Sequence, residues 1–149
     1  WDAGWRRLTA FDYAPAGVRR AAELFGDERP VDLRVADARA LPYADGAFDA
    51  VLDKGTLDAV FLSGGADATD RVHSLRRAVD ELERTVQPGG IVLSVSAAAA
   101  PHVSAAFDAS GTWFSLWDGS VHVTDDGFAS INVDATMLAW ERGMGDGAR

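Results

Sequence analysis

Cysteine is absent from this 149-residue sequence, and so are long hydrophobic runs. The lack of thiols excludes disulfides, thiolate metal sites and thiol nucleophiles. No run of about 18 uncharged apolar residues is present, so we expect no transmembrane helix and no membrane partner. A basic-then-apolar leader is also missing, although the sequence opens with Trp1 rather than Met, so a leader could have preceded it.

Positive charge is scarce. Lys and Arg total 14 against 23 Asp and Glu, which gives a net charge of −9 and a pI near 4.6. Because such a surface repels phosphate backbones, we expect no nucleic-acid partner. The three histidines, His73, His102 and His122, are too scattered to form a metal site, so no metal is expected either. We expect a cytoplasmic protein.

Strand and helix patterns alternate along the chain. This alternation favours an α/β fold with a mostly parallel sheet in one domain, residues 1–142, followed by a flexible glycine-rich tail, residues 143–149. Pro15 suits the first turn of a helix that Gly26 ends. Strands are predicted at residues 8–12, 31–35, 48–53, 91–95, 113–117 and 131–140.

The longest predicted helix is capped by Thr69 or Asp70 and ends at residues 88–90. Its apolar stripe consists of Val72, Leu75, Val79, Leu82 and Val86. The strand that follows is apolar except for Ser94, which is typical of a strand covered on both faces. A short helix is predicted over residues 101–107. The turn between the last two strands is either Asp118-Gly119 or Asp125-Asp126-Gly127, and the sequence does not distinguish them.

Polar residues follow the first two predicted strands, where nucleotide cofactors bind in open α/β sheets. Asp12, with Tyr13 beside it, could accept hydrogen bonds from ribose hydroxyls. It could equally cap the helix near Pro15. Asp37 could accept from an adenine amino group while the small residue Ala38 lets the ring approach, or Asp37 could form an Asx turn.

A third cluster, Asp53-Lys54-Gly55-Thr56-Leu57-Asp58, follows the third strand. Gly55 permits a tight exit from the strand, and the charged residues would lie near the reactive end of a cofactor. The same run also reads as a helix start, with Thr56 as the cap and apolar residues packing inward. Both interpretations can hold together.

These clusters, with Leu41-Pro42-Tyr43-Ala44-Asp45-Gly46-Ala47-Phe48-Asp49 and Gln87-Pro88-Gly89-Gly90, come in an order that resembles the class I S-adenosylmethionine-dependent methyltransferases. The Lys-Gly-Thr-Leu-Asp run is similar to that of the methyltransferase-like 13 group, which includes the elongation factor 1-alpha lysine methyltransferases. The resemblance implies a Rossmann-like α/β fold whose sheet is mostly parallel, with an antiparallel C-terminal strand.

The resemblance also implies roles for individual residues. Asp12, with Tyr13 beside it, matches the acid that holds the cofactor ribose. Asp37 and Ala38 match the pair that holds adenine, and Lys54 matches the lysine that contacts the methionine end of S-adenosyl-L-methionine.

One part of the family pattern has no counterpart in this sequence. The family's domain opens with a strand and a Gly-x-Gly loop, and nothing before Asp12 matches them. We therefore expect a partial domain, or fragment, with its first strand missing. Two strand edges would then be exposed between the strands that end at Asp12 and Asp53, and the chain alone would bind the cofactor weakly.

The predicted function is methylation of a protein lysine, with a translation elongation factor as the partner to which the resemblance points. Asp58 is predicted to be catalytic by positioning the substrate amine. Two alternatives stay open. The chain could be a catalytically incomplete interaction domain that keeps the fold, or an NAD-dependent oxidoreductase, because a strand-end acid also binds the ribose of NAD.

Overall fold

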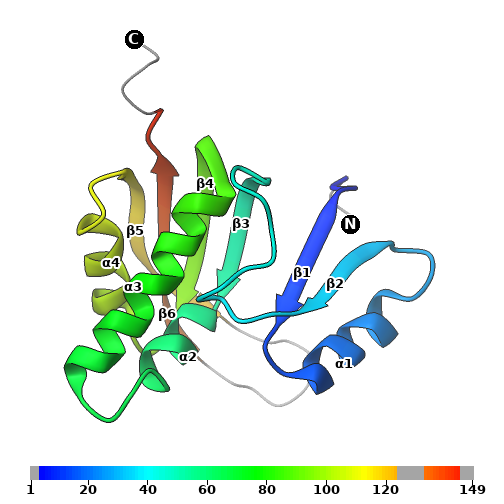
Figure 1. The fold of residues 1–149 in the computed structure, drawn as a ribbon, viewed down its shortest axis with the longest axis horizontal. Coiled ribbons are helices and arrows are strands. Elements are labelled where there is room, and N and C mark those ends of the chain that lie inside the picture. Colours follow the sequence, from blue (N-terminus) through cyan, green and yellow to red (C-terminus); the bar gives the residue numbers. More distant parts are fainter. Residues whose placement is uncertain (1–3, 124–132, 145–149) are drawn as a thin grey trace.

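The structure, a computed structural model, describes residues 4–123 and 133–144 (Figure 1). The elements in chain order are β1 (Leu8–Asp12), α1 (Pro15–Phe25), β2 (Val31–Val35), β3 (Phe48–Lys54), α2 (Thr56–Leu62), α3 (Ala68–Thr85), β4 (Val86–Ser96), α4 (Ala100–Asp108), β5 (Trp113–Val123) and β6 (Val133–Arg142). In the described residues, no helix is long and apolar enough to cross a membrane.

The strands form two sheets. β1 pairs with β2 in parallel, and a second sheet has the order β3-β4-β6-β5. β3 and β4 are parallel, whereas β6 is antiparallel to both of its neighbours. Figure 1 shows β1 and β3 running in the same direction, separated from one another. The predicted α/β fold with one antiparallel strand is confirmed, and the sheet is interrupted between β1 and β3, where the missing strand was expected.

One hydrophobic core lies between the larger sheet and helices α2, α3 and α4. Leu57, Val60 and Phe61 of α2 are buried there, as predicted. Phe107 stacks on Trp140 with ring centroids 3.8 Å apart, so α4 is anchored directly on β6. The core therefore fixes the carboxyl ends of β3 and β4 relative to the helices that follow them.

The β1–α1–β2 segment is packed differently, because none of its residues is buried. The ring of Tyr43 connects it to the larger sheet. The Tyr43 ring lies 6.4 Å from Phe11 of β1 and 4.9 Å, edge-on, from Phe48 of β3. An aromatic side chain from the connecting loop thus spans the interruption in the sheet.

Some sequence predictions were wrong in detail. The cap of α3 is Asp67, which accepts from the amide of Asp70, in place of Thr69 or Asp70. Val72 is 52% exposed, so it lies outside the buried face of α3, which includes Leu75, Val79 and Leu82. Asp118 and Gly119 lie inside β5, so they do not form the hairpin turn. The other predicted turn, residues 125–127, and residues 145–149 of the predicted tail lie outside the described residues.

The β1–α1–β2 segment contributes no buried residue to the core, and we expect this difference to affect its stability. We expect backbone amides in β1, α1 and β2 of this chain to exchange with deuterium through lower-energy openings than those of α3 and β4, because little apolar surface holds the segment in place. Hydrogen–deuterium exchange resolved by peptide measures this. Equal protection in the two regions would contradict the packing described above.

Candidate functional site

The carboxyl ends of β1 and β2 lie together. Asp12 is in register with Val35, and the amide of Ala36 donates to the Asp12 carbonyl at 3.1 Å. Asp37 follows two residues after the end of β2. Two of the predicted site acids therefore come from neighbouring, paired strand ends at one edge of the fold.

Asp12 uses one carboxylate oxygen locally and keeps the other available. Its Oδ1 accepts from the amide of Ala14 at 2.8 Å, which steadies the turn into α1. Among the described residues, none donates a hydrogen bond to Oδ2. A Cβ placed on Gly17 would lie 2.6 Å from that oxygen, so glycine at this position lets α1 pass close to the carboxylate. The two roles considered from sequence, turn acceptor and ribose acceptor, are compatible in this geometry.

Asp37 forms the predicted alternative, an Asx turn, because its Oδ1 accepts from the amide of Arg39 at 2.9 Å. The Arg39 guanidinium also donates to both Asp37 oxygens, at 2.7 to 3.2 Å. These hydrogen bonds lower the pKa of Asp37. A ligand amino group at this carboxylate would have to share it with Arg39.

The other predicted cofactor residues lie on both sides of the sheet interruption. Tyr13 is 78% exposed at the end of β1, and Ala38 is half-buried against the main core. Lys54 ends β3 and is exposed. The structure thus brings together the β1–β2 group, Asp12 and Asp37, while Lys54 belongs to the other sheet.

Asp58 has a different role from the predicted one. Its carboxylate is 6% exposed and accepts from the Ser96 hydroxyl at 2.5 Å. It also accepts from three consecutive amides, those of residues 97, 98 and 99, at 2.8 to 3.1 Å. With both oxygens occupied, Asp58 holds the β4–α4 loop and does not offer a free carboxylate to a substrate amine. Sequence alone could not separate the two roles, because burial is not visible in it.

Asp53 supports the neighbouring turn in the same way. It accepts from the Ser94 hydroxyl at 2.6 Å and from the amide of Thr56 at 2.8 Å. Asp53 therefore serves the start of α2, in place of the predicted Thr56 cap; the N-cap residue itself is Gly55, with a φ of 75° that glycine tolerates. Burial raises the pKa of Asp53, and these hydrogen bonds oppose the increase.

Arg84 and Glu81, which the sequence analysis did not select, fix the loop after β2. Arg84 donates to the carbonyls of Leu41 and Tyr43 and to Asp45, at 2.7 to 2.9 Å. Glu81 accepts from the amide of Leu41 at 2.6 Å and pairs with Arg84, whose hydrogen bonds lower the pKa of Glu81. Their spacing of three residues signals a helix-surface pair, but nothing in it identifies a loop about 40 residues away.

Comparison with known proteins assigns the family. Residues 1–94 match the family described as "Methyltransferase domain". The chain belongs to the methyltransferase family. This confirms the resemblance seen in the sequence, and with it S-adenosyl-L-methionine as the family's cofactor.

Two curated relatives of this methyltransferase chain illustrate the match. EEF1A lysine methyltransferase 4 of Mus musculus is 34% identical over 103 residues, covering 66% of this chain and 40% of that protein. The eEF1A lysine and N-terminal methyltransferase of Xenopus laevis is 36% identical over 104 residues, covering 67% of this chain and 14% of that protein. The chain therefore spans well under half the length of these relatives.

Solved structures establish the fold of the methyltransferase. A structure determined for the conversion of a disulfide bond into a thioacetal group during echinomycin biosynthesis superimposes with a TM-score of 0.74 at 18% identity, covering 97% of this chain and 69% of that one. The N-methyltransferase NodS of Bradyrhizobium japonicum WM9, in complex with S-adenosyl-L-homocysteine, gives a TM-score of 0.66 at 18% identity, covering 91% and 66%.

The residues present fit the adenosine half of such a cofactor. Asp12 has an oxygen to which no described residue donates, and Ala38, next to Asp37, has a small side chain. When bound, the cofactor supplies an electrophilic methyl group. In the described residues, no Gly-x-Gly loop precedes β1.

The four donors around Asp58 give a stability prediction. We expect Asp58→Ala to lower the free energy of unfolding by about 3–5 kcal/mol, since buried donors lose their charged acceptor. Urea denaturation would measure the change, with Asp108→Ala on the exposed end of α4 as the matched control. A change below about 1 kcal/mol, the usual size for an exposed acid, would contradict the structural role.

The raised pKa of Asp53 predicts how the stability of the protein depends on pH. The folded pKa of Asp53 lies above its ordinary value of 3.8, so its stabilising contribution is present below pH 3.8 and is lost as the pH rises through the raised folded value. We expect the Tm of the parent protein, relative to that of Asp53→Asn, to fall as the pH rises across this window. A Tm difference independent of pH would contradict the raised pKa.

Proposed function

We propose that the full-length protein transfers a methyl group from S-adenosyl-L-methionine to a lysine side chain of a protein substrate, with a translation elongation factor as the substrate class. The observation that carries the proposal is the pair of acids, Asp12 and Asp37, at neighbouring parallel strand ends. The relatives named as eEF1A lysine methyltransferases support the choice of lysine.

Asp12 and Asp37 would hold the adenosine part of the donor. A carboxylate at the end of β1 can accept from both ribose hydroxyls, and these charge-assisted hydrogen bonds are strong. Asp37 would accept from the adenine amino group, and Lys54 would meet the methionine carboxylate from β3. Such a transfer depends on proximity and orientation of the two reactants and needs no covalent enzyme intermediate.

The proposal predicts the outcome of binding measurements on the full-length protein. We expect Asp12→Ala and Asp37→Ala each to weaken binding of S-adenosyl-L-methionine by about 10- to 100-fold, as the loss of a charged acceptor does. Asp32→Ala is the matched control, because Asp32 also pairs with an arginine but lies near the start of β2, away from the strand ends that carry Asp12 and Asp37. Isothermal titration calorimetry measures the affinity of each variant for S-adenosyl-L-methionine and, in parallel, for NAD.

Three results would count against the proposal. Unchanged affinity in Asp12→Ala and Asp37→Ala would refute the assigned contacts. Preferential binding of NAD would favour an oxidoreductase. Binding of neither cofactor by the full-length protein would favour the interaction domain, which keeps the fold without the reaction.

A further inference from the structure

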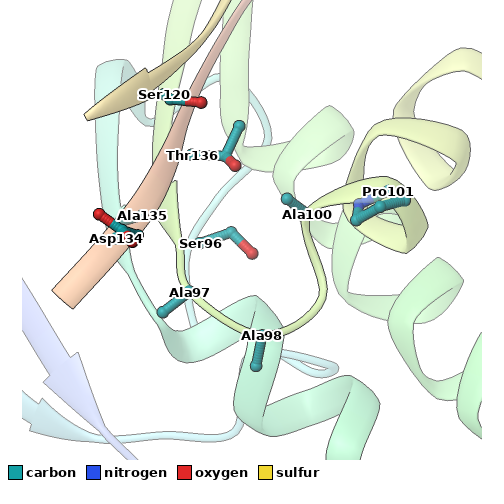
Figure 2. Close-up of a pocket in the computed structure, with 9 residues that line it drawn as sticks. All are labelled: Ser96, Ala97, Ala98, Ala100, Pro101, Ser120, Asp134, Ala135 and Thr136. Atoms are coloured by element: carbon teal, nitrogen blue, oxygen red, sulfur yellow. The ribbon is translucent and has the colours of Figure 1, made fainter. Parts of the chain in front are cut away.

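Two places for recognition lie at the carboxyl edge of the fold. One is a pocket of about 500 Å³ at the end of β4, which Figure 2 shows between the loop after β4, the first turn of α4 and the facing strands β5 and β6. The described residues that line this pocket all come from the chain after residue 95, so none of them belongs to the β1–β2 group. The other place is the loop after β2, where Asp37 would meet adenine and where Arg39 lies against it.

Arg39 folds back on Asp37 within one tight turn. The amide of Ala40 donates to the Asp37 carbonyl at 3.0 Å, and the amide of Arg39 donates to Asp37 Oδ1 at 2.9 Å. The guanidinium of Arg39 then approaches the same carboxylate, with Nε 2.9 Å from Oδ1 and Nη2 2.7 Å from Oδ2. Two such parallel hydrogen bonds form the bidentate arrangement that fixes the plane and the direction of a carboxylate.

The donors of Arg39 occupy most of the acceptor positions of Asp37. A carboxylate has about four such positions, divided between its two oxygens. Oδ1 accepts from the Arg39 amide and from Nε, whereas Oδ2 accepts from Nη2 and, at 3.2 Å, from the shared Nε. The shared contact is the longest of the four, so Oδ2 keeps one acceptor direction, and the turn determines where it points.

Arg39 also sets the charge of this group. Its side-chain hydrogen bonds are the largest cause of the lowered pKa of Asp37, and the charge of Arg77 on α3 lowers that pKa further. Asp37 is thus an ionised acceptor at neutral pH, while the adjacent guanidinium offsets its charge. Such a pair suits a neutral N–H donor better than a cation, because little net charge is left to attract the cation.

We propose that Arg39 is a positioning residue for base recognition: it holds Asp37 so that Oδ2 accepts from the 6-amino group of adenine, and the site thereby selects a 6-amino purine over a 6-oxo purine. This inference rests on the adenosine contacts of the proposed function. A 6-oxo purine directs an oxygen toward the same position, where two acceptors meet without a proton between them. A carboxylate released from Arg39 could turn toward the ring N–H of the 6-oxo base, so the selection would be lost.

The test compares two ligands on the full-length protein by isothermal titration calorimetry. The ligands are S-adenosyl-L-homocysteine and S-inosyl-L-homocysteine, its counterpart with oxygen in place of the 6-amino group. We expect the parent to prefer the adenosyl ligand and Arg39→Ala to reduce that preference about three- to tenfold, the range for one net hydrogen bond. Arg39→Lys should lose as much, because it keeps the charge but not the two-pronged geometry.

Arg20→Ala is the matched control, since Arg20 is an exposed arginine on α1 that pairs with Glu23. It should leave the preference unchanged. In the Asp37→Ala background, Arg39→Ala should have no further effect on either affinity, because Arg39 acts through Asp37.

Four results overturn the role of Arg39. They are an unchanged preference in Arg39→Ala, equal weakening of both ligands, tighter binding of the adenosyl ligand, and a parental preference in Arg39→Lys. Equal weakening would mean that Arg39 only supports the loop, and tighter binding would mean that it competes with adenine.

Methylation assays on the same proteins separate this inference from the proposed function. If the parent methylates a lysine substrate and the preference does not depend on Arg39, the inference fails and the proposed function stands. If the preference depends on Arg39 but no methyl transfer occurs to any lysine substrate, including an elongation factor, the proposed function fails and the role of Arg39 stands.

Discussion

Two buried carboxylates hold the carboxyl end of the larger sheet in place. Asp53 and Asp58 each accept from a serine hydroxyl of β4 and from backbone amides at the start of a helix. A buried charge is tolerated only when several donors surround it. The amide donors here belong to the turns that follow β3 and β4. Asp53 fixes the β3–α2 turn and Asp58 fixes the β4–α4 loop. The amides of the β4–α4 loop are therefore engaged by Asp58 and are not free to bind an anion.

The adenosine side of the proposed site depends on weaker constraints. β1, α1 and β2 contain no buried residue, and they reach the larger sheet through the Tyr43 ring and the loop that carries it. Arg84 and Glu81 hold that loop on α3 by hydrogen bonds to its carbonyls and to an amide. No hydrogen-bonded sheet joins β1 to β3 in the described residues, so the position of Asp37 relative to Lys54 depends on this loop and on the contacts of the Tyr43 ring with Phe11 and Phe48.

Much of the fold could be predicted from sequence, because strand and helix periodicity is local: β1, α1 and β2 have the predicted bounds. The interruption of the sheet was also predicted, because the family's first strand and Gly-x-Gly loop have no counterpart in the sequence. The role of Asp58 could not be predicted, since a strand-end acid looks the same whether it caps a buried loop or contacts a substrate. Ser94, the one polar residue in an apolar strand, was a visible signal for a buried partner. The contacts of Arg84 could not be found, because they join segments about 40 residues apart.

The interruption between β1 and β3 also bears on how the chain behaves in solution. Within the described parts of the chain, each of these strands pairs on one side, so a row of backbone donors and acceptors is left on its other edge. Such edges favour strand pairing between molecules, which a net charge of −9 opposes by mutual repulsion. At an ionic strength of 0.1 M that repulsion is screened beyond about 10 Å. Colloidal stability of the isolated chain is therefore tied to salt concentration, and low-salt buffers should keep it monomeric best.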